Sequence, residues 1–150
     1  MENHIIRVLA LDPGKTTGFA QGRIDDGLMI VSSGQLEYSP FQLYLAMKLA
    51  EPTHLVYESF EFRRHARDKL ELYSCELIGI IKMFAEETEC DIKPQTAAQG
   101  KAHFTDAKLK SALIYKPNKP HANDAVRHLL QWFQFGQGFQ FNTRGYESGT

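Results

Sequence analysis

The sequence predicts one mixed α/β domain, and three observations support this prediction. The chain has 150 residues, which is the usual size of a single domain with its own core. It is 43% apolar and 11% aromatic, and its charges of both signs are mixed, a composition that excludes disorder of the whole chain. The predicted elements follow the order β-β-β-α-β-α-β-α-α without a repeat or a long linker, so helices are expected to pack in layers on a mixed sheet.

The first three elements are predicted to be antiparallel strands. Residues 5–11 form a nearly continuous apolar run that ends at Asp12, and such a run is typical of a central strand covered on both faces. An extended pattern resumes at 18–24. The Asp-Gly pair at 26–27 then predicts a tight hairpin turn into a third strand at 28–38.

Helices alternate with shorter strands in the rest of the chain. Ser39 and Pro40 predict a helix start, because proline in the first turn loses no hydrogen bond, and helical periodicity continues to residue 50. The remaining predicted elements are a buried strand at 54–60, a helix at 70–87, a short strand at 91–94, a short helix at 105–115 and a last helix at 121–133. The sequence therefore predicts a folded domain over 1–133.

Residues 134–150 are rich in Gln, Gly and Phe and show no clear period. We expect them to form a flexible C-terminal tail.

Two basic segments stand out against a formal net charge of −1. Residues 62–70 carry four Arg or Lys against one acid, and residues 101–119 carry five lysines against one acid. Such segments suit a protein that holds phosphates beside an acidic site. They are also what two solvated faces would look like, and charge alone favours that second interpretation.

The sequence predicts a soluble protein of the cytoplasm, or of the host cytoplasm if its origin is viral. No apolar run approaches the roughly 20 residues of a membrane helix, and an aspartate interrupts the N-terminal apolar segment before a signal-peptide core could form. Cys75 and Cys90 are too few for a disulfide framework and lack the spacing of a zinc site. We expect both to be reduced thiols.

Three acidic residues stand where predicted elements begin or end. Asp12 ends the first strand, Glu58 lies in the fourth strand, and Asp124 lies in the first turn of the last helix. A carboxylate beside a buried strand needs a partner. If the first and fourth strands are neighbours, Asp12 and Glu58 approach each other, and a divalent cation between them would relieve their repulsion.

Each acid also has a purely structural explanation. Asp12 precedes Pro-Gly and fits a turn, Glu58 could pair with Arg63 or Arg64, and Asp124 could interact with the helix dipole. The three together are harder to explain in this way, because all of them lie beside apolar cores.

Three segments carry a family resemblance: VLALDPGKTTGFA, VYESF and HANDAVRHLL. In this order the chain resembles the RuvC-like Holliday junction resolvases of the RNase H-like superfamily, over residues 5 to about 133. The resemblance implies an RNase H-like α/β fold with a mixed five-stranded sheet, three strands antiparallel and then two parallel, and helices on both faces.

The resemblance also implies a site and an activity. Asp12, Glu58, His121 and Asp124 match the family's catalytic, metal-binding positions, which hold two Mg²⁺ or Mn²⁺ ions for hydrolysis of phosphodiester bonds in four-way junctions. His121 could ligate a metal, orient the attacking water or carry a proton, and it could equally be an exposed helix-start residue. No nucleotide cofactor is expected.

The family resemblance further implies a homodimer that pairs through the helix at 70–87, where Ser74, Cys75 and Gly79 allow close approach. The alternative is that this helix packs on its own sheet. The residues expected to contact DNA are Phe60, Phe62, Arg63, Arg64, Arg67, Lys69, Lys101, Lys108 and Lys110.

The chain departs from the family pattern in three places. The turn after Asp12 is one residue shorter than in many cellular members, as in some phage-like relatives. His121 stands where many members have an aspartate. Position 61 is Glu, where relatives place an aromatic residue, although Phe60 and Phe62 flank it.

Rival functions remain open from sequence alone. A related nuclease that acts on flap DNA or structured RNA would use the same metals, and a catalytically inactive module could bind branched DNA. Actin-like ATPases and sugar kinases need two such domains, and this chain supplies one. Gly14-Lys15-Thr16 imitates the end of a P-loop, but Leu9 stands where that motif needs glycine.

Overall fold

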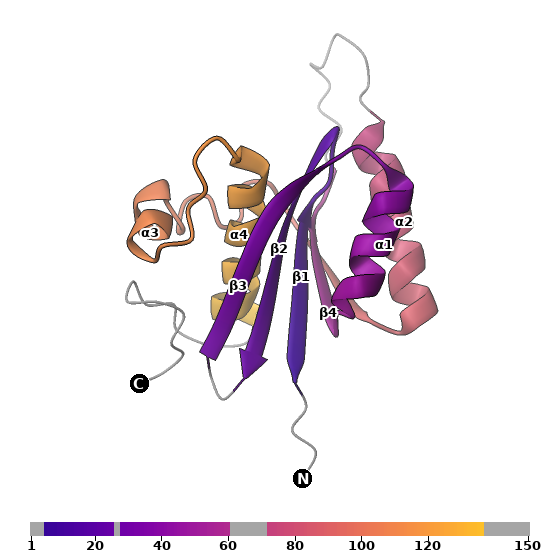
Figure 1. Ribbon diagram of the computed structural model, residues 1–150, viewed down its shortest axis with the longest axis horizontal. Coiled ribbons are helices and arrows are strands. Elements are labelled where there is room, and N and C mark those ends of the chain that lie inside the picture. The colour runs from indigo at the N-terminus through magenta and orange to yellow at the C-terminus, as the bar shows by residue number, and fades with distance from the viewer. Residues whose placement is uncertain (1–4, 26–27, 61–71, 137–150) are drawn as a thin grey trace.

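The computed structural model describes residues 5–25, 28–60 and 72–136, which form a five-stranded sheet with helices on both faces (Figure 1). The strand order is β3-β2-β1-β4-β5. The strands are β1 (Ile6–Asp12), β2 (Thr16–Asp25), β3 (Leu28–Glu37), β4 (His54–Glu58) and β5 (Asp91–Gln95). Strands β1, β2 and β3 are antiparallel, whereas β4 is parallel to β1 and β5 is parallel to β4. The predicted RNase H-like fold class is confirmed.

The helices divide between the two faces of the sheet. They are α1 (Pro40–Ala50), α2 (Tyr73–Thr88), α3 (Asp106–Ser111) and α4 (Pro120–Gln131), which continues into a π-helical turn, η1 (Trp132–Gly136). Helices α1 and α2 lie on one side of the sheet, and α3 and α4 lie on the other (Figure 1). None of the helices within the described ranges is long and apolar enough to cross a membrane.

Strand β1 contributes to both hydrophobic cores, as its unbroken apolar sequence predicts. Val8 and Ala10 join the core on the α4 side, and Leu9 and Leu11 join the core under α1 and α2. All four side chains are almost fully buried. Because β1 is the central strand and is packed on both faces, the residue at its end, Asp12, is held in a rigid position.

Local signals explain where most helices begin and end. The Ser39 hydroxyl accepts a hydrogen bond from the Gln42 amide at 3.1 Å, so it caps α1 as the sequence predicts. Helix α3 has a matching cap from Thr105. Helices α1 and α2 end at Glu51 and Glu89, which have left-handed φ angles of 46° and 57°, a conformation that stops a helix.

The largest difference from the predicted elements is in α3, which ends at Ser111 and not at residue 115. Leu113 adopts a left-handed φ of 61° and turns the chain out of the helix. Ile114 and Tyr115 then pack against the core on the α4 side. Strand β2 also starts two residues earlier than predicted, because Thr16 pairs with Glu37 of β3.

The last helix is also longer than predicted, since η1 continues it to Gly136 and not to residue 133. Three predicted features lie outside the described residues: the hairpin turn at 26–27, the first basic segment and the remainder of the C-terminal tail.

Candidate active site

Asp12 and Glu58 lie side by side at one edge of the sheet. Strands β1 and β4 are parallel and adjacent, with Leu11 paired to Tyr57, so the next residue on each strand reaches the same edge. This is the neighbourhood that the sequence predicts for the two acids. Asp12 is buried, with 6% of its surface exposed.

The N-terminal part of α4 brings two more predicted site residues to this edge. His121 Nδ1 lies 3.0 Å from Asp12 Oδ2, although the two residues are 109 positions apart in the chain. Asp124 lies one turn further along α4 and acts electrostatically on Asp12. The structure therefore brings together all four predicted catalytic residues.

A glycine and a glutamine fix the start of α4 against the sheet. Gly18 of β2 pairs with Asp12, and a Cβ atom at Gly18 would lie 1.8 Å from the carbonyl oxygen of His121. The Gln35 side-chain oxygen on β3 accepts hydrogen bonds from the amides of His121 at 3.1 Å and Ala122 at 3.4 Å. These contacts satisfy two free amides of the helix start and set its distance from Asp12.

The carboxyl groups of Asp12 and Glu58 share one proton. Burial, the hydrogen bond to Glu58, and repulsion by Glu58 and Asp124 together raise the pKa of Asp12 from 3.8 to about 9. Burial also acts to raise the pKa of Glu58, but hydrogen bonds from His128 and Asp12 outweigh it and lower that pKa to about 2. At neutral pH the proton stays on Asp12 and the charge stays on Glu58.

Two buried residues behind Glu58 were missed in the sequence. His128 Nε2 lies 3.5 Å from Glu58 Oε1, and His128 Nδ1 lies 2.7 Å from the side-chain oxygen of Gln95. A helical signal for His128 exists in the sequence, since it follows Asp124 by four residues and His121 by seven, which places all three on one helix face. The sequence holds no comparable signal for Gln95.

Asp124 has two cationic neighbours. Arg127 Nη1 donates to Asp124 Oδ1 at 2.8 Å, and Lys101 Nζ lies 4.0 Å from Oδ2. Arg127 also pairs with Asp106 and donates from Nε to the Phe104 carbonyl at 2.8 Å. Arg127 was missed in the sequence, although it stands three residues after Asp124.

The predicted DNA-contacting residues fall into different places. Lys101 is beside the site, and Phe60 is 40% exposed two residues after Glu58. Lys108 donates to the His103 carbonyl at 2.6 Å, and Lys110 lies over the Tyr115 ring. The other predicted contacts, Phe62, Arg63, Arg64, Arg67 and Lys69, lie outside the described residues.

The helix expected to pair two protomers, α2, is anchored at its start to the turn after Asp12. The Ser74 hydroxyl donates to the Pro13 carbonyl at 2.8 Å, so this small residue has an intramolecular role. Cys75 is exposed, and a Cβ atom added at Gly79 would meet nothing within 4 Å. The homodimer remains a prediction.

The chemistry of the donor set fits a divalent cation. As the side chains stand, each carboxylate is turned toward a protein partner, and no three acidic, His or Cys side chains in the described parts of the chain are arranged as a metal-binding group. Yet burial, together with the carboxyl groups of Glu58 and Asp124, raises the pKa of Asp12 to about 9. A cation can replace the Asp12 proton, and carboxylate oxygens with one imidazole are ligands that Mg²⁺ and Mn²⁺ accept.

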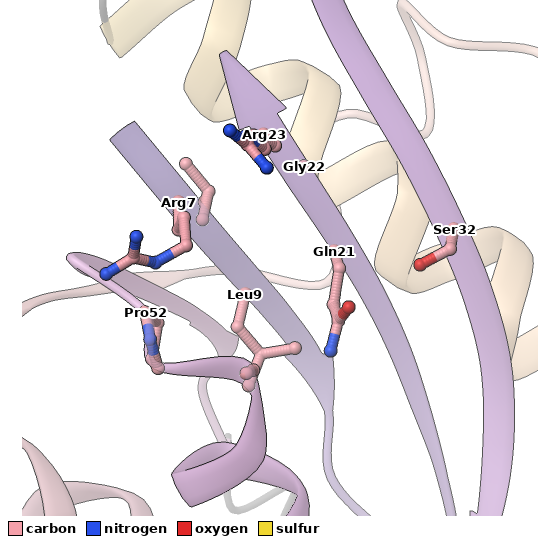
Figure 2. Close-up of a pocket in the computed structure, with 9 residues that line it drawn as sticks. Arg7, Leu9, Gln21, Gly22, Arg23, Ser32 and Pro52 are labelled. Carbon is pink, nitrogen blue, oxygen red and sulfur yellow. The ribbon is translucent and has the colours of Figure 1, made fainter. Parts of the chain in front are cut away.

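A pocket of about 210 Å³ lies away from these residues, at the opposite end of β1 (Figure 2). Leu9 and Gly22 are among the residues that line it. The Arg7 guanidinium points away from Gln21 and Ser32 (Figure 2), because its Nε donates to the Glu51 carbonyl at 2.7 Å. Polar groups do not converge on this pocket, so its size alone does not indicate chemistry.

Comparisons with known proteins agree with the fold. No protein-family model matches the chain, and no curated protein matches it either. The solved structures that are similar to the chain include two of T. thermophilus RuvC. The structure of T. thermophilus RuvC in complex with a Holliday junction substrate matches with a TM-score of 0.67 at 15% identity. This match covers 89% of the present chain and 96% of the RuvC chain. A second T. thermophilus RuvC structure has a TM-score of 0.63 at 16% identity, and covers 89% and 97%.

The strand order and the helices on both faces define an RNase H-like α/β fold. Within that class, the chain has the fold of the RuvC resolvases, as the sequence resemblance implies.

Proposed function

We propose that this protein is a divalent-metal-dependent endonuclease that cuts branched DNA, and four-way junctions in particular. The observation that carries the proposal is the meeting of Asp12, Glu58, Asp124 and His121 at one edge of a RuvC-like sheet. One of the similar structures is described as RuvC bound to a Holliday junction substrate, which supports this substrate class.

The four site residues would hold two Mg²⁺ or Mn²⁺ ions. When bound, such ions activate a water and stabilise the leaving oxygen of a phosphodiester. Asp12 and Glu58 sit on rigid strand ends and would form the fixed part of the site. His121 is close to Asp12 and its side chain is 45% exposed, so it can serve as a ligand or exchange a proton with solvent.

Lys101 is the described cation best placed to hold the DNA backbone at the site. Its side chain is 52% exposed, and its amine lies 4.0 Å from Asp124, so a phosphate that approaches the carboxylates meets a compensating charge. A four-way junction has twofold symmetry, and we propose that two copies of the chain cut it at symmetric positions.

We expect paired, symmetric nicks when a labelled mobile four-way junction is incubated with the protein and Mg²⁺ or Mn²⁺. Chelation, or the Asp12→Asn substitution, should lower the cleavage rate by about a thousandfold or more, because both remove the metal chemistry on which the reaction depends. The measurement is a cleavage time course on the junction and on matched duplex, flap and structured RNA substrates.

Asp91→Asn is a suitable control, because Asp91 is an exposed carboxylate at the opposite end of the parallel strands. Tight junction binding without metal-dependent cutting would make the protein a binding module. Faster cutting of flap DNA or RNA would keep the metal site and replace the proposed substrate.

A further inference from the structure

We propose that His128 is a positioning residue that fixes the Glu58 carboxylate for metal binding, and that Gln95 anchors the His128 ring. This inference rests on the proposed function and adds two residues to its site. The two side chains form a buried relay behind Glu58 that spans β5, α4 and β4.

The hydrogen bonds define the orientation of both side chains in the relay. The Gln95 Nε2 group donates to the backbone carbonyl of His128 at 3.2 Å, so the other amide atom, Oε1, faces His128 Nδ1 at 2.7 Å. An amide oxygen can only accept, and His128 Nδ1 therefore carries a proton. The ring nitrogen presented to Glu58 is Nε2, which lies 3.5 Å from Glu58 Oε1.

Burial makes this arrangement rigid. His128 is 1% exposed and Gln95 is 3% exposed, which leaves neither side chain an alternative partner in water. Gln95 is also the strand neighbour of Glu58, and its backbone carbonyl accepts from the Ser59 amide at 2.8 Å. The backbone and the side chain of Gln95 thus both hold the end of β4.

The relay has a specific effect on a metal ligand. A carboxylate held on one oxygen keeps its other oxygen in a fixed direction, and groups that orient metal ligands in this way typically change metal affinity by about 10- to 100-fold.

Two substitutions of His128 separate its contact with Glu58 from its contact with Gln95. In His128→Asn, the amide nitrogen takes the place of Nδ1 and keeps the hydrogen bond to Gln95, but nothing reaches Glu58. In His128→Gln, the amide nitrogen takes the place of Nε2 and reaches Glu58, but the bond to Gln95 is lost. The readouts are the Mn²⁺ dissociation constant of the DNA-free protein, measured by electron paramagnetic resonance, and the melting temperature.

We expect His128→Asn to weaken Mn²⁺ binding by about 10-fold or more with a small change in melting temperature. His128→Gln should bind Mn²⁺ within a few-fold of the parent protein while melting at a lower temperature. Unchanged Mn²⁺ affinity in His128→Asn would overturn the proposal, and so would affinities that follow the melting temperature in both variants.

The parent protein and Asp12→Asn distinguish this proposal from the proposed function. If the parent binds no Mn²⁺, or if Asp12→Asn binds it equally well, the metal site itself is wrong and the positioning role is wrong with it. If Mn²⁺ binding depends on Asp12 but His128→Asn binds normally, only the positioning role is wrong.

Discussion

Replacing Gly18 by alanine should lower the melting temperature by about 10 °C and the cleavage rate by about a hundredfold. The added Cβ would lie 1.8 Å from the His121 carbonyl oxygen and 2.9 Å from the Ala122 amide nitrogen. Both are backbone atoms, so α4 must move away from β2, at a cost of about 3 kcal/mol. A shift of about 1 Å in catalytic groups is enough for the loss of rate.

Gly79→Ala is the matched control for this substitution. A Cβ atom at Gly79 meets no atom within 4 Å, and alanine is the better helix former by about 0.5–1 kcal/mol. This variant should melt slightly above the parent protein. A Gly18→Ala variant that melts and cuts like the parent would show that the start of α4 is not held at this distance from Asp12.

Asp12→Asn should make the metal-free protein more stable at high pH while it abolishes cleavage. The pKa of Asp12 is about 9 in the folded state and 3.8 ordinarily, so the folded state retains a proton that the unfolded chain releases. Its contribution to stability is full below pH 4 and is lost as the pH rises toward 9, by up to about 1.4 kcal/mol per pH unit. An asparagine side chain does not ionise, so Asp12→Asn does not lose this stability as the pH rises.

The expected gain at pH 8 is about 2–3 kcal/mol or more, which is about 5–10 °C or more in melting temperature. At pH 4 the two proteins should melt together. The measurement is thermal unfolding from pH 4 to 9 in the presence of a chelator.

Glu58→Gln should have the opposite effect on stability. The pKa of Glu58 is lowered to about 2, so its contribution is present above pH 4.5 and is lost as the pH falls toward 2. Glu58→Gln should therefore melt below the parent at neutral pH.

Mn²⁺ should stabilise the parent more than Asp12→Asn. Equal melting of Asp12→Asn and the parent at every pH would contradict the shared proton.

Much of the central sheet could be predicted from the sequence, because its signals are local. The apolar run of β1 and the position of Asp12 at its end predict a central strand whose acid lies at the sheet edge. Ser39 and Pro40 predict the start of α1. These features depend on neighbouring residues, and the structure confirms them.

The rest of the site depends on contacts between distant parts of the chain. Gln95 and His128 are 33 residues apart, and neither belongs to a recognisable motif. By sequence, Arg127 is an ordinary surface residue. Its ion pair with Asp106 arises only because the fold places α3 beside α4. The end of α3 was mispredicted for a related reason, because burial of Ile114 and Tyr115 against the core favours a left-handed Leu113 over another helical turn.

The strand part and the helix part of the site are far apart along the chain, and this distance determines when the site can be completed during synthesis. The ribosome adds His121, the partner of Asp12 on α4, 109 residues after Asp12, and the core on that face also needs Leu129 and Phe133. A nascent chain that has not reached Asp124 lacks one of the three carboxylates. The proposed site can therefore assemble only after α4 has been synthesised.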